Sequence, residues 1–409
     1  MKWFCAQIGA REHYAVPRVL HRDGRLGALY TVYWAGKLIR GAARTTKARR
    51  LRSLATRFHR ELEGAPVISW NARSLACEIG IRPQKNQVYE SFIKVGASFA
   101  VRVRDALAGR NDLGSDSIFF SYDTGALEVM EWCREHGIKC ILNQMDPSRV
   151  EVEMVQEEEK RWPGWCAQPL TVPEEYFRRR EREWALADYV MVNSDFCRQA
   201  LIRQGVPVEK VAVVPLCFEG EAGMRQIEKV ETTIQKSKPK LRVLFLGQVI
   251  LRKGIQYLLQ AAKMLESEPI QFDIVGPVGI SGAAIASASS NMIFHGRATR
   301  DQTANYYQRN DVFVLPTLSD GFAITQLEAM SYGLPVVATP CCGEVVSDGT
   351  DGFIVPPRDA DALAKALLRY VRNPELTRFQ SNAALARVRQ FSLDHLAANL
   401  RILEQRVAL

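Results

Sequence analysis

The chain has 409 residues, of which 47% are hydrophobic and 24% charged, and its formal net charge is +9 at pH 7. This length allows two or three domains with cores of their own, and the composition is that of a soluble globular protein rather than a disordered or fibrous one. Because no stretch approaches the roughly 18 consecutive apolar residues of a membrane-spanning helix, and the start, MKWFCAQIGAREHY, becomes polar too early for a signal peptide, we expect a cytoplasmic protein.

The first part of the chain alternates short apolar stretches with helical patterns. The apolar stretches predict strands and are WFCAQIG, which ends at Gly9, SIFFSYD, which ends at Asp123, KCILNQ and DYVMVNS. ALEVMEWCREHG and DFCRQALIRQG predict helices between or after these strands. The charged, tryptophan-rich segment 151–188 is expected to be helical at both ends.

A basic segment lies near the N-terminus, at residues 37–60. It contains nine Lys and Arg and no acidic residue, and Leu51, Leu54 and Phe58 recur at helical spacing. This pattern predicts a basic amphipathic helix, which can lie on an anionic membrane surface or can be a solvated face. Nucleic acid is not expected as a partner, because the segment has one aromatic residue for stacking and no binding module accompanies it.

The nine cysteines are scattered from Cys5 to Cys342, and no two form a C-x-x-C pair. This spacing indicates reduced, buried thiols rather than a zinc or redox site.

The second part of the chain begins after a polar linker, residues 219–240. Strands and helices alternate regularly from residue 241, which predicts repeated βαβ units. The predicted strands are RVLFLG, QFDIVG, MIFHG, DVFVLP and PVVAT, and the predicted helices are IQYLLQAAKMLE, DQTANYYQRN and TQLEAMSYG. We therefore expect an α/β protein with two doubly wound, Rossmann-like domains, residues 1–218 and 241–391, facing each other across a cleft. Residues 392–409 are expected to form a C-terminal helix that packs back on the first domain.

The loop QVILRKG, which follows the strand RVLFLG, holds Arg252 and Lys253 in front of a helix. Ligands of open α/β sheets bind beyond the carboxyl ends of the strands, and a cation beside the free N–H groups of a helix N-terminus favours phosphate. An ordinary surface turn is the alternative.

Two acidic residues flank a loop and a helix start in SDGFAITQLEAMSYG. Asp320 precedes a helix that we expect to begin near residue 323 or 324, and Glu328 lies about one turn into it. Carboxylates accept hydrogen bonds from sugar hydroxyls, and N–H groups at a helix start can point at a phosphate. Ordinary helix-start acids are the alternative. The N–H groups concerned are those of Gly321, Phe322 and Ala323.

Three segments, in this order, resemble the retaining glycosyltransferases of family 4: GQVILRKGIQYLLQA, SDGFAITQLEAMSYGLPVVAT and DGTDGFIVPPRDADALAKAL. That family has the GT-B fold, a G-R-x4-K-G loop and an E-x7-E motif. The resemblance is dense over residues 241–391 and thinner through EWALADYVMVNSDFCRQALIRQGVPVEKVAVVP. In the first 170 residues the resemblance rests mainly on the expected order of strands and helices.

The resemblance implies a nucleoside diphosphate sugar as the donor, with residues 241–391 as the donor domain and residues 1–218 as the acceptor-side domain. Lys253 would hold its diphosphate, Glu328 its ribose and Asp320 the transferred sugar, while Arg297 would lie by the base and the Gly9 loop near the diphosphate. Residues implied to bind the donor are Gly9, Gly247, Gln248, Arg252, Lys253, Gly276, Arg297, Gly321, Phe322, Ala323 and Glu328.

The donor-side motifs depart from the family pattern in two places. Asp320 stands where the family usually has Glu, which shortens the side chain by one methylene. Gln248 stands where the family usually has a phosphate-binding Arg, and Arg252 is a candidate replacement.

The histidine that usually follows the fourth strand of the first domain is missing. FFSYDTGALEV offers Ser121, Tyr122 and Asp123 at that place, and His13 in GAREHY is a candidate substitute. The expected catalytic residues are therefore Lys253, Asp320, Asp123 and His13.

The reaction implied is sugar transfer to an acceptor hydroxyl with retention, without a side-chain nucleophile. Metal is not expected, because Asp359 of the single D-x-D precedes an apolar-periodic helix as an N-cap. A saccharide or lipid-linked acceptor at the cytoplasmic face of the membrane would fit the basic segment. The alternatives are a non-catalytic nucleotide-sugar-binding scaffold and a GT-B epimerase.

Overall fold

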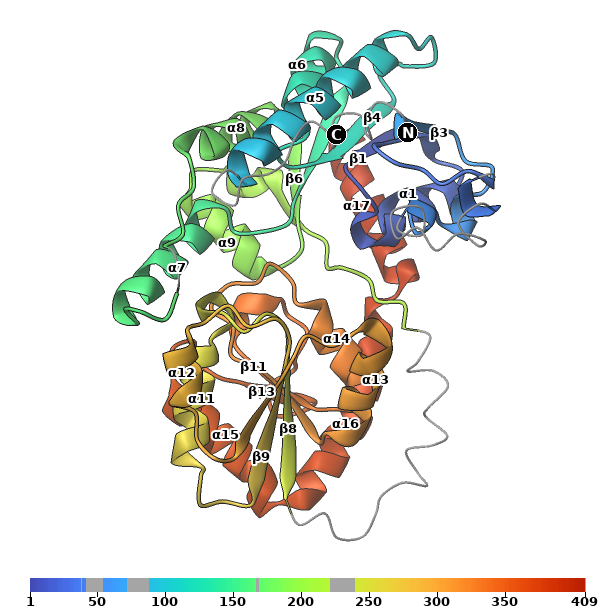
Figure 1. The fold of residues 1–409 in the computed structure, drawn as a ribbon. Helices are drawn as coiled ribbons and strands as arrows, with labels where there is room; N and C mark the ends of the chain where they lie inside the picture. The colour runs from blue at the N-terminus through green and yellow to red at the C-terminus, as the bar shows by residue number, and fades with distance from the viewer. Residues whose placement is uncertain (38, 42–53, 72–87, 167–168, 221–239, 409) are drawn as a thin grey trace.

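The computed structural model describes residues 1–37, 39–41, 54–71, 88–166, 169–220 and 240–408. Two parallel sheets, each with helices on both faces, lie one above the other (Figure 1). The predicted pair of Rossmann-like domains is confirmed. No helix among the described residues is both long and apolar enough to cross a membrane.

The first sheet has seven strands in the order β3-β2-β1-β4-β5-β6-β7. Its strands are β1 (Lys2–Gln7), β2 (Leu26–Thr31), β3 (Val67–Ser69), β4 (Ser117–Tyr122), β5 (Lys139–Gln144), β6 (Tyr189–Val192) and β7 (Val211–Val213). The sequence order reverses between β1 and β4, and this switch point is where an open α/β sheet opens a ligand crevice.

The helices of the N-terminal domain cover both faces of this sheet, and the sheet separates two hydrophobic cores. These helices are α1 (Ala15–Arg22), α5 (Val88–Ala108), α6 (Leu127–Glu135), α7 (Arg149–Arg161), α8 (Glu174–Leu186) and α9 (Asp195–Arg203). One core contains Phe99 of α5 and Met130 of α6, and the other contains Val16 of α1 and Leu400 from the end of the chain. The four predicted strands and both predicted helices are present, whereas β2, β3 and α5 were not predicted.

The second sheet has six strands in the order β10-β9-β8-β11-β12-β13. Its strands are β8 (Leu241–Leu246), β9 (Ile270–Val275), β10 (Met292–Gly296), β11 (Val312–Leu315), β12 (Val336–Ala338) and β13 (Gly352–Ile354). Its helices are α11 (Ile255–Met264), α12 (Gly282–Ala286), α13 (Arg300–Arg309), α14 (Ile324–Ser331), α15 (Ala360–Arg372) and α16 (Pro374–Val388). The switch point of this sheet lies between β8 and β11.

The predicted N-cap of α15 is confirmed, because the Asp359 carboxylate accepts a hydrogen bond from the Ala362 N–H at 2.8 Å. Helix α14 begins at Ile324, as expected.

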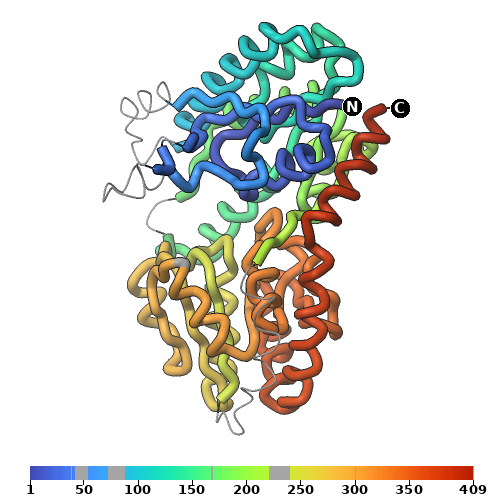
Figure 2. Tube along the Cα trace, turned by 90° about the vertical axis from the view of Figure 1, so that its right-hand side faces the viewer, coloured from blue at the N-terminus to red at the C-terminus, as the bar shows by residue number. Residues whose placement is uncertain are grey.

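The C-terminal helix α17 (Leu393–Ala408) rises from the second domain and packs on α1 of the first (Figure 2). Glu404 near its end accepts from the Met1 ammonium at 3.0 Å and from the Trp3 indole at 2.8 Å. The two ends of the chain therefore lie side by side.

The basic segment departs from its prediction at its C-terminal end. Residues 42–53 lie outside the described residues, so the amphipathic helix stays a prediction there. Phe58 lies outside any helix, because its ring packs against Trp34 at 5.3 Å and under the Arg40 guanidinium at 3.5 Å. Lys37 lies 3.6 Å from Glu63, so Lys37 and Arg40, two basic residues in the described part of this segment, contact other side chains.

Candidate functional site

Two loops at the carboxyl edge of the second sheet pack side by side. One follows β8 and contains the 3-10 helix η4 (Leu251–Lys253), and the other follows β11. The Arg252 carbonyl accepts from the Leu318 N–H at 2.9 Å and from the Thr317 hydroxyl at 3.1 Å. Gly254 has a φ of +72°, and a Cβ there would lie 1.8 Å from the Pro316 carbonyl oxygen. Only glycine allows this close approach.

This packing brings together the cations and the acid that the sequence analysis singled out. The Lys253 ammonium forms an ion pair with the Asp320 carboxylate. The Arg252 guanidinium donates to the Ser319 carbonyl at 2.9 Å and lies 3.9 Å from Asp320. A phosphate bound at this place would have to replace Asp320 as the partner of Lys253 and Arg252.

An acid from the N-terminal domain joins this cluster. Glu151 of α7 lies 3.3 Å from Arg252 and accepts from the Ser319 hydroxyl at 2.7 Å. Burial raises the pKa of Glu151, although the nearby Arg252 acts against this shift. We expected Arg252 to bind a phosphate. Its guanidinium already contacts Glu151, the Ser319 carbonyl and Asp320, so a phosphate would have to compete with these partners.

Glu328 lies on α14, half-buried, and contacts a tyrosine. The Tyr307 hydroxyl donates to the Glu328 Oε2 at 2.8 Å, and the Tyr307 ring stacks on Tyr332 at 5.2 Å. Burial, with the Glu328 charge, raises the pKa of Tyr307 well above its usual value, so Tyr307 stays a donor. Within the described residues the other carboxylate oxygen of Glu328 has no partner, so it can accept from a ligand hydroxyl.

Of the three amides before α14 that we expected to point at a phosphate, one has a different partner in the structure. The Ala323 N–H donates to the Cys342 carbonyl at 3.0 Å, so it does not point at a phosphate as expected. The amides of Gly321 and Phe322 have no acceptor in the described part of the chain. The Phe322 side chain is buried against Phe391, with ring centroids 5.9 Å apart.

Gly321 touches the opposite domain. A Cβ there would lie 2.0 Å from the Met145 carbonyl oxygen, just beyond β5. The loops after β11 and β5 therefore meet, and the carboxyl edges of the two sheets face each other.

Four other expected donor-binding residues lie at strand ends. Gly276 has a φ of +143°, and a Cβ there would lie 1.7 Å from the Gly247 carbonyl oxygen. The backbone therefore requires glycine at this position whether or not a ligand binds. Gln248 and Arg297 are exposed beyond β8 and β10. No contact between these two side chains and the Lys253 cluster occurs among the described residues.

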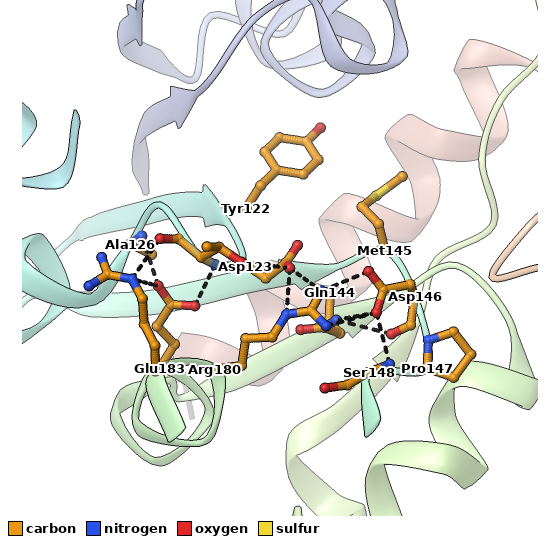
Figure 3. Close-up of polar contacts among 12 residues, drawn as sticks. Tyr122, Asp123, Ala126, Gln144, Met145, Asp146, Pro147, Ser148, Arg180 and Glu183 are labelled. Carbon is orange, nitrogen blue, oxygen red and sulfur yellow. Dashed lines mark hydrogen bonds and ion pairs between the residues drawn. The ribbon is translucent and has the colours of Figure 1, made fainter. Parts of the chain in front are cut away.

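Asp123, an expected catalytic residue, is buried in an ion-pair network (Figure 3). The Arg180 Nε donates to Asp123 at 2.9 Å, and its Nη1 and Nη2 donate to Asp146 at 2.9 and 2.7 Å. A buried carboxylate needs such a counter-charge. Burial acts to raise the pKa of Asp146, but Arg180 lowers it overall.

A second buried acid, Glu183, caps the helix that follows Asp123 (Figure 3). Its carboxylate accepts from the N–H groups of Thr124, Ala126 and Leu127 at 2.6 to 3.1 Å. Burial raises its pKa to about 7. The sequence analysis missed Arg180 and Glu183 because RRREREW resembles a solvated charged face.

The turn after β1 contains the remaining candidates, Gly9 and His13. Gly9 has a φ of +82°, and a Cβ there would lie 3.0 Å from the Arg57 guanidinium. His13 is exposed. Glu12, His13 and Tyr14 all have left-handed backbone, with φ of 50°, 49° and 62°, which costs of order 1–3 kcal/mol for each non-glycine residue.

Helix α7 bridges the two domains, which the sequence did not predict. Glu158 is fully buried and accepts from the Gln256 amide at 2.9 Å and the Tyr257 hydroxyl at 2.8 Å, and Arg358 lies 2.7 Å from it. Figure 1 shows α7 at the lower edge of the N-terminal domain, on the side where α11 and α12 of the second domain lie. No group of three or more His, Cys, Asp or Glu in the described ranges could hold a metal ion.

The comparison with protein families decides what the second domain is. Residues 240–373 match the family model described as glycosyl transferases group 1. This part of the chain is a group 1 glycosyltransferase domain. Both loops of the Lys253 cluster and the whole of α14 lie within the matched residues of this glycosyltransferase domain.

Similar proteins agree with this assignment. The chain is 31% identical over 173 residues to the D-inositol 3-phosphate glycosyltransferase of Streptomyces griseus, covering 38% of this chain and 37% of that protein. It is 26% identical over 226 residues to the O-antigen chain mannosyltransferase B of Escherichia coli, covering 51% and 58%. The aligned part thus spans 37% and 58% of the length of these two curated relatives.

Among solved structures, Anabaena Alr3699/HepE in complex with UDP has a TM-score of 0.59 at 15% identity and covers the whole of both chains. At this identity the likeness concerns the fold. The glycosyltransferase domain is therefore the second half of a GT-B fold.

Proposed function

We propose that the protein transfers a sugar from a nucleoside diphosphate sugar to an acceptor hydroxyl, with retention at the anomeric carbon. The observation that carries the proposal is the packing of the Lys253 loop against the Asp320 loop at the switch point of the second sheet. The group 1 match over these loops supports it, as does the UDP complex of the similar Anabaena protein.

In this proposal Lys253 and Arg252 hold the diphosphate, Glu328 the ribose and Asp320 the transferred sugar. The leaving diphosphate gains charge as the glycosidic bond breaks, so cations fixed beside it stabilise the transition state more than the ground state. When a phosphate takes over Lys253, the Asp320 carboxylate becomes free to accept from sugar hydroxyls.

No side-chain nucleophile is required, because the leaving phosphate can take the proton of the acceptor hydroxyl. We expect no metal requirement, and an unchanged transfer rate in excess EDTA tests that expectation.

Calorimetric titration with UDP and with GDP tests the donor site. Lys253→Ala and Glu328→Ala are each expected to weaken binding of one nucleotide at least tenfold, about 1.4 kcal/mol. Lys263→Ala, an exposed lysine on α11, is the matched control and should bind as the unchanged protein does. Equal binding by Lys253→Ala and the control would contradict the assignment.

Product analysis tests transfer and stereochemistry. The anomeric proton coupling in the NMR spectrum of the product should match that of the donor sugar. A protein that binds nucleotide but transfers nothing would be a non-catalytic scaffold, which the exposed Gln248 in place of an arginine favours. Conversion of the donor sugar without an acceptor would indicate an epimerase.

For the acceptor we infer a saccharide or lipid-linked saccharide of a cell-surface polysaccharide or glycolipid. The names of relatives from Escherichia coli and Erwinia amylovora, which concern O-antigen and amylovoran, support this class. The basic segment 37–60 fits peripheral binding at the inner face of the membrane by its charge. Liposome binding that is unaffected when Lys47, Arg49, Arg50 and Arg52 become Glu would remove this inference.

A further inference from the structure

Helix α7 lies along the second domain although it follows a strand of the first. Met154, Trp162 and Trp165 pack against the hydrophobic core of the second domain, and the Trp165 carbonyl accepts from the Ser281 N–H at 2.8 Å. Helix α7 also contacts η4, the 3-10 helix that holds Lys253. This stretch of the chain is therefore docked on the domain that contains the proposed donor site.

One face of α7 presents two carboxylates to the second domain. Glu151 and Glu158 lie about two helical turns apart, which places them on the same face of the helix. Glu158 is fully buried, and Arg358 lies 2.7 Å from its carboxylate. The Glu151 side chain is 23% exposed. Glu158 is thus a fixed anchor, whereas the Glu151 side chain can turn toward water while the helix stays docked.

Glu151 occupies a cation that a diphosphate would need. Its Oε2 accepts from the Ser319 hydroxyl at 2.7 Å and from the Arg252 Nη1 at 3.3 Å. The same Nη1 donates to the Ser319 carbonyl at 2.9 Å and lies 3.9 Å from the Asp320 carboxylate. Since Lys253 pairs with Asp320, the two cations of this cluster face two acids, and their charges cancel.

A diphosphate that enters the site competes with Glu151 for Arg252. The phosphate oxygens and the carboxylate both bind the guanidinium N–H groups well, and the Glu151 charge repels a phosphate that Lys253 alone would hold. Glu151 must therefore turn away before both cations face the ligand. A site that is free for only part of the time binds its ligand with an affinity that is reduced by that fraction.

We propose that Glu151 is a gate on the proposed donor site, which occupies Arg252 in the free protein and turns away when a diphosphate binds. The inference rests on the proposed function, because it takes the donor diphosphate as the ligand of Arg252 and Lys253. An ion pair that only fastens α7 is the alternative, but Glu158 and the two tryptophans already fasten the helix.

Calorimetric titration of UDP, GDP and inorganic pyrophosphate into Glu151→Gln tests the gate. The amide keeps the shape of the side chain and an acceptor for the Ser319 hydroxyl, but it removes the charge. The variant should bind pyrophosphate, and whichever nucleotide the protein accepts, about fivefold more tightly or better, the gain for a site free of Glu151 in about a fifth or less of the molecules. Uridine and guanosine lack the phosphates, so the substitution should leave their binding unchanged.

Glu153→Gln is the matched control. Glu153 lies on the same helix but is exposed, so this variant removes the same charge from α7 without changing a contact of Arg252. It should bind pyrophosphate and nucleotide as the unchanged protein does, whereas a general effect of charge would appear in both variants.

Two results would overturn the inference. One is that Glu151→Gln, shown to be folded by circular dichroism, binds pyrophosphate and nucleotide no more tightly than Glu153→Gln. The other is that Glu151→Gln binds neither ligand. Nucleotide binding that Lys253→Ala weakens and Glu151→Gln does not tighten ends this inference alone. Tighter pyrophosphate binding by Glu151→Gln, without nucleotide binding in any sample, ends the donor assignment alone and leaves Glu151 as the gate of an anion site.

Discussion

Replacing Arg180 by methionine is expected to destabilise the N-terminal domain by about 3–5 kcal/mol. Arg180 is buried, and it donates to both Asp123 and Asp146. The variant leaves two carboxylates without their counter-charge. Asp146 is half-buried and can regain water, whereas Asp123 is buried and cannot. The loss therefore comes mainly from Asp123, and we expect a value near the lower end of this range.

Urea unfolding followed by tryptophan fluorescence measures this loss. All seven tryptophans precede residue 190, so their fluorescence reports on the N-terminal part of the chain. Arg182→Met is the matched control, because Arg182 lies on the same helix and pairs with Glu131, but its side chain is 63% exposed. An exposed ion pair contributes about 0–1 kcal/mol.

The pH dependence gives a second check. Arg180 holds the pKa of Asp146 below its usual value although burial acts to raise it. A lowered folded-state pKa stabilises above the unfolded value, which is about 4 for Asp, and this stability is lost as the pH falls. The deficit of Arg180→Met should thus be larger at pH 7 than at pH 4. A loss at pH 7 no greater than that of Arg182→Met would refute the reasoning, as would a deficit that grows in acid.

Three further changes have expected outcomes. Gly321→Ala should cost about 1–3 kcal/mol in urea unfolding, because its Cβ would meet the Met145 carbonyl at 2.0 Å; an unchanged midpoint would contradict this. Asp359→Ala should cost about 0.5–2 kcal/mol through loss of the cap, and Asp359→Asn should restore most of it. The raised pKa of Glu12 means that its ionisation opposes folding, so stability is lost as the pH rises through about 7. The melting temperature of Glu12→Gln should exceed that of the unchanged protein by more at pH 8.5 than at pH 5. An equal difference at the two pH values would contradict this prediction.

The second domain could be predicted well from sequence because its signals are local. Each strand is a short apolar run that ends at glycine or proline, and the helices between them show their own periodicity. The strands β2 and β3 were missed for the opposite reason. LGALYT contains a glycine and VIS has only three residues, so neither is a continuous apolar run, and they become strands through pairing with β1 and with each other.

The predicted site residues show the same difference between local signals and long-range contacts. Lys253, Asp320 and Glu328 could be proposed from sequence because each lies in a contiguous motif close to a strand end. The partner of Asp123 could not be predicted, because Arg180 is 57 residues away and stands in a run of charges that looks solvated. The sequence can place an acid at a strand end, but it cannot show whether a buried guanidinium already neutralises it.

The two switch points differ in what they can bind. In the second domain, the switch point between β8 and β11 presents two cations, which suits a diphosphate. In the first domain, the switch point between β1 and β4 presents the Glu12 carboxylate, which accepts from the Tyr122 hydroxyl, beside the Arg11 guanidinium, which lies 5.1 Å from the centre of the Tyr122 ring. The contact of Gly321 with Met145 makes these two edges face each other. A donor bound at the Lys253 loop, as proposed, would therefore lie opposite the strand ends of the N-terminal sheet.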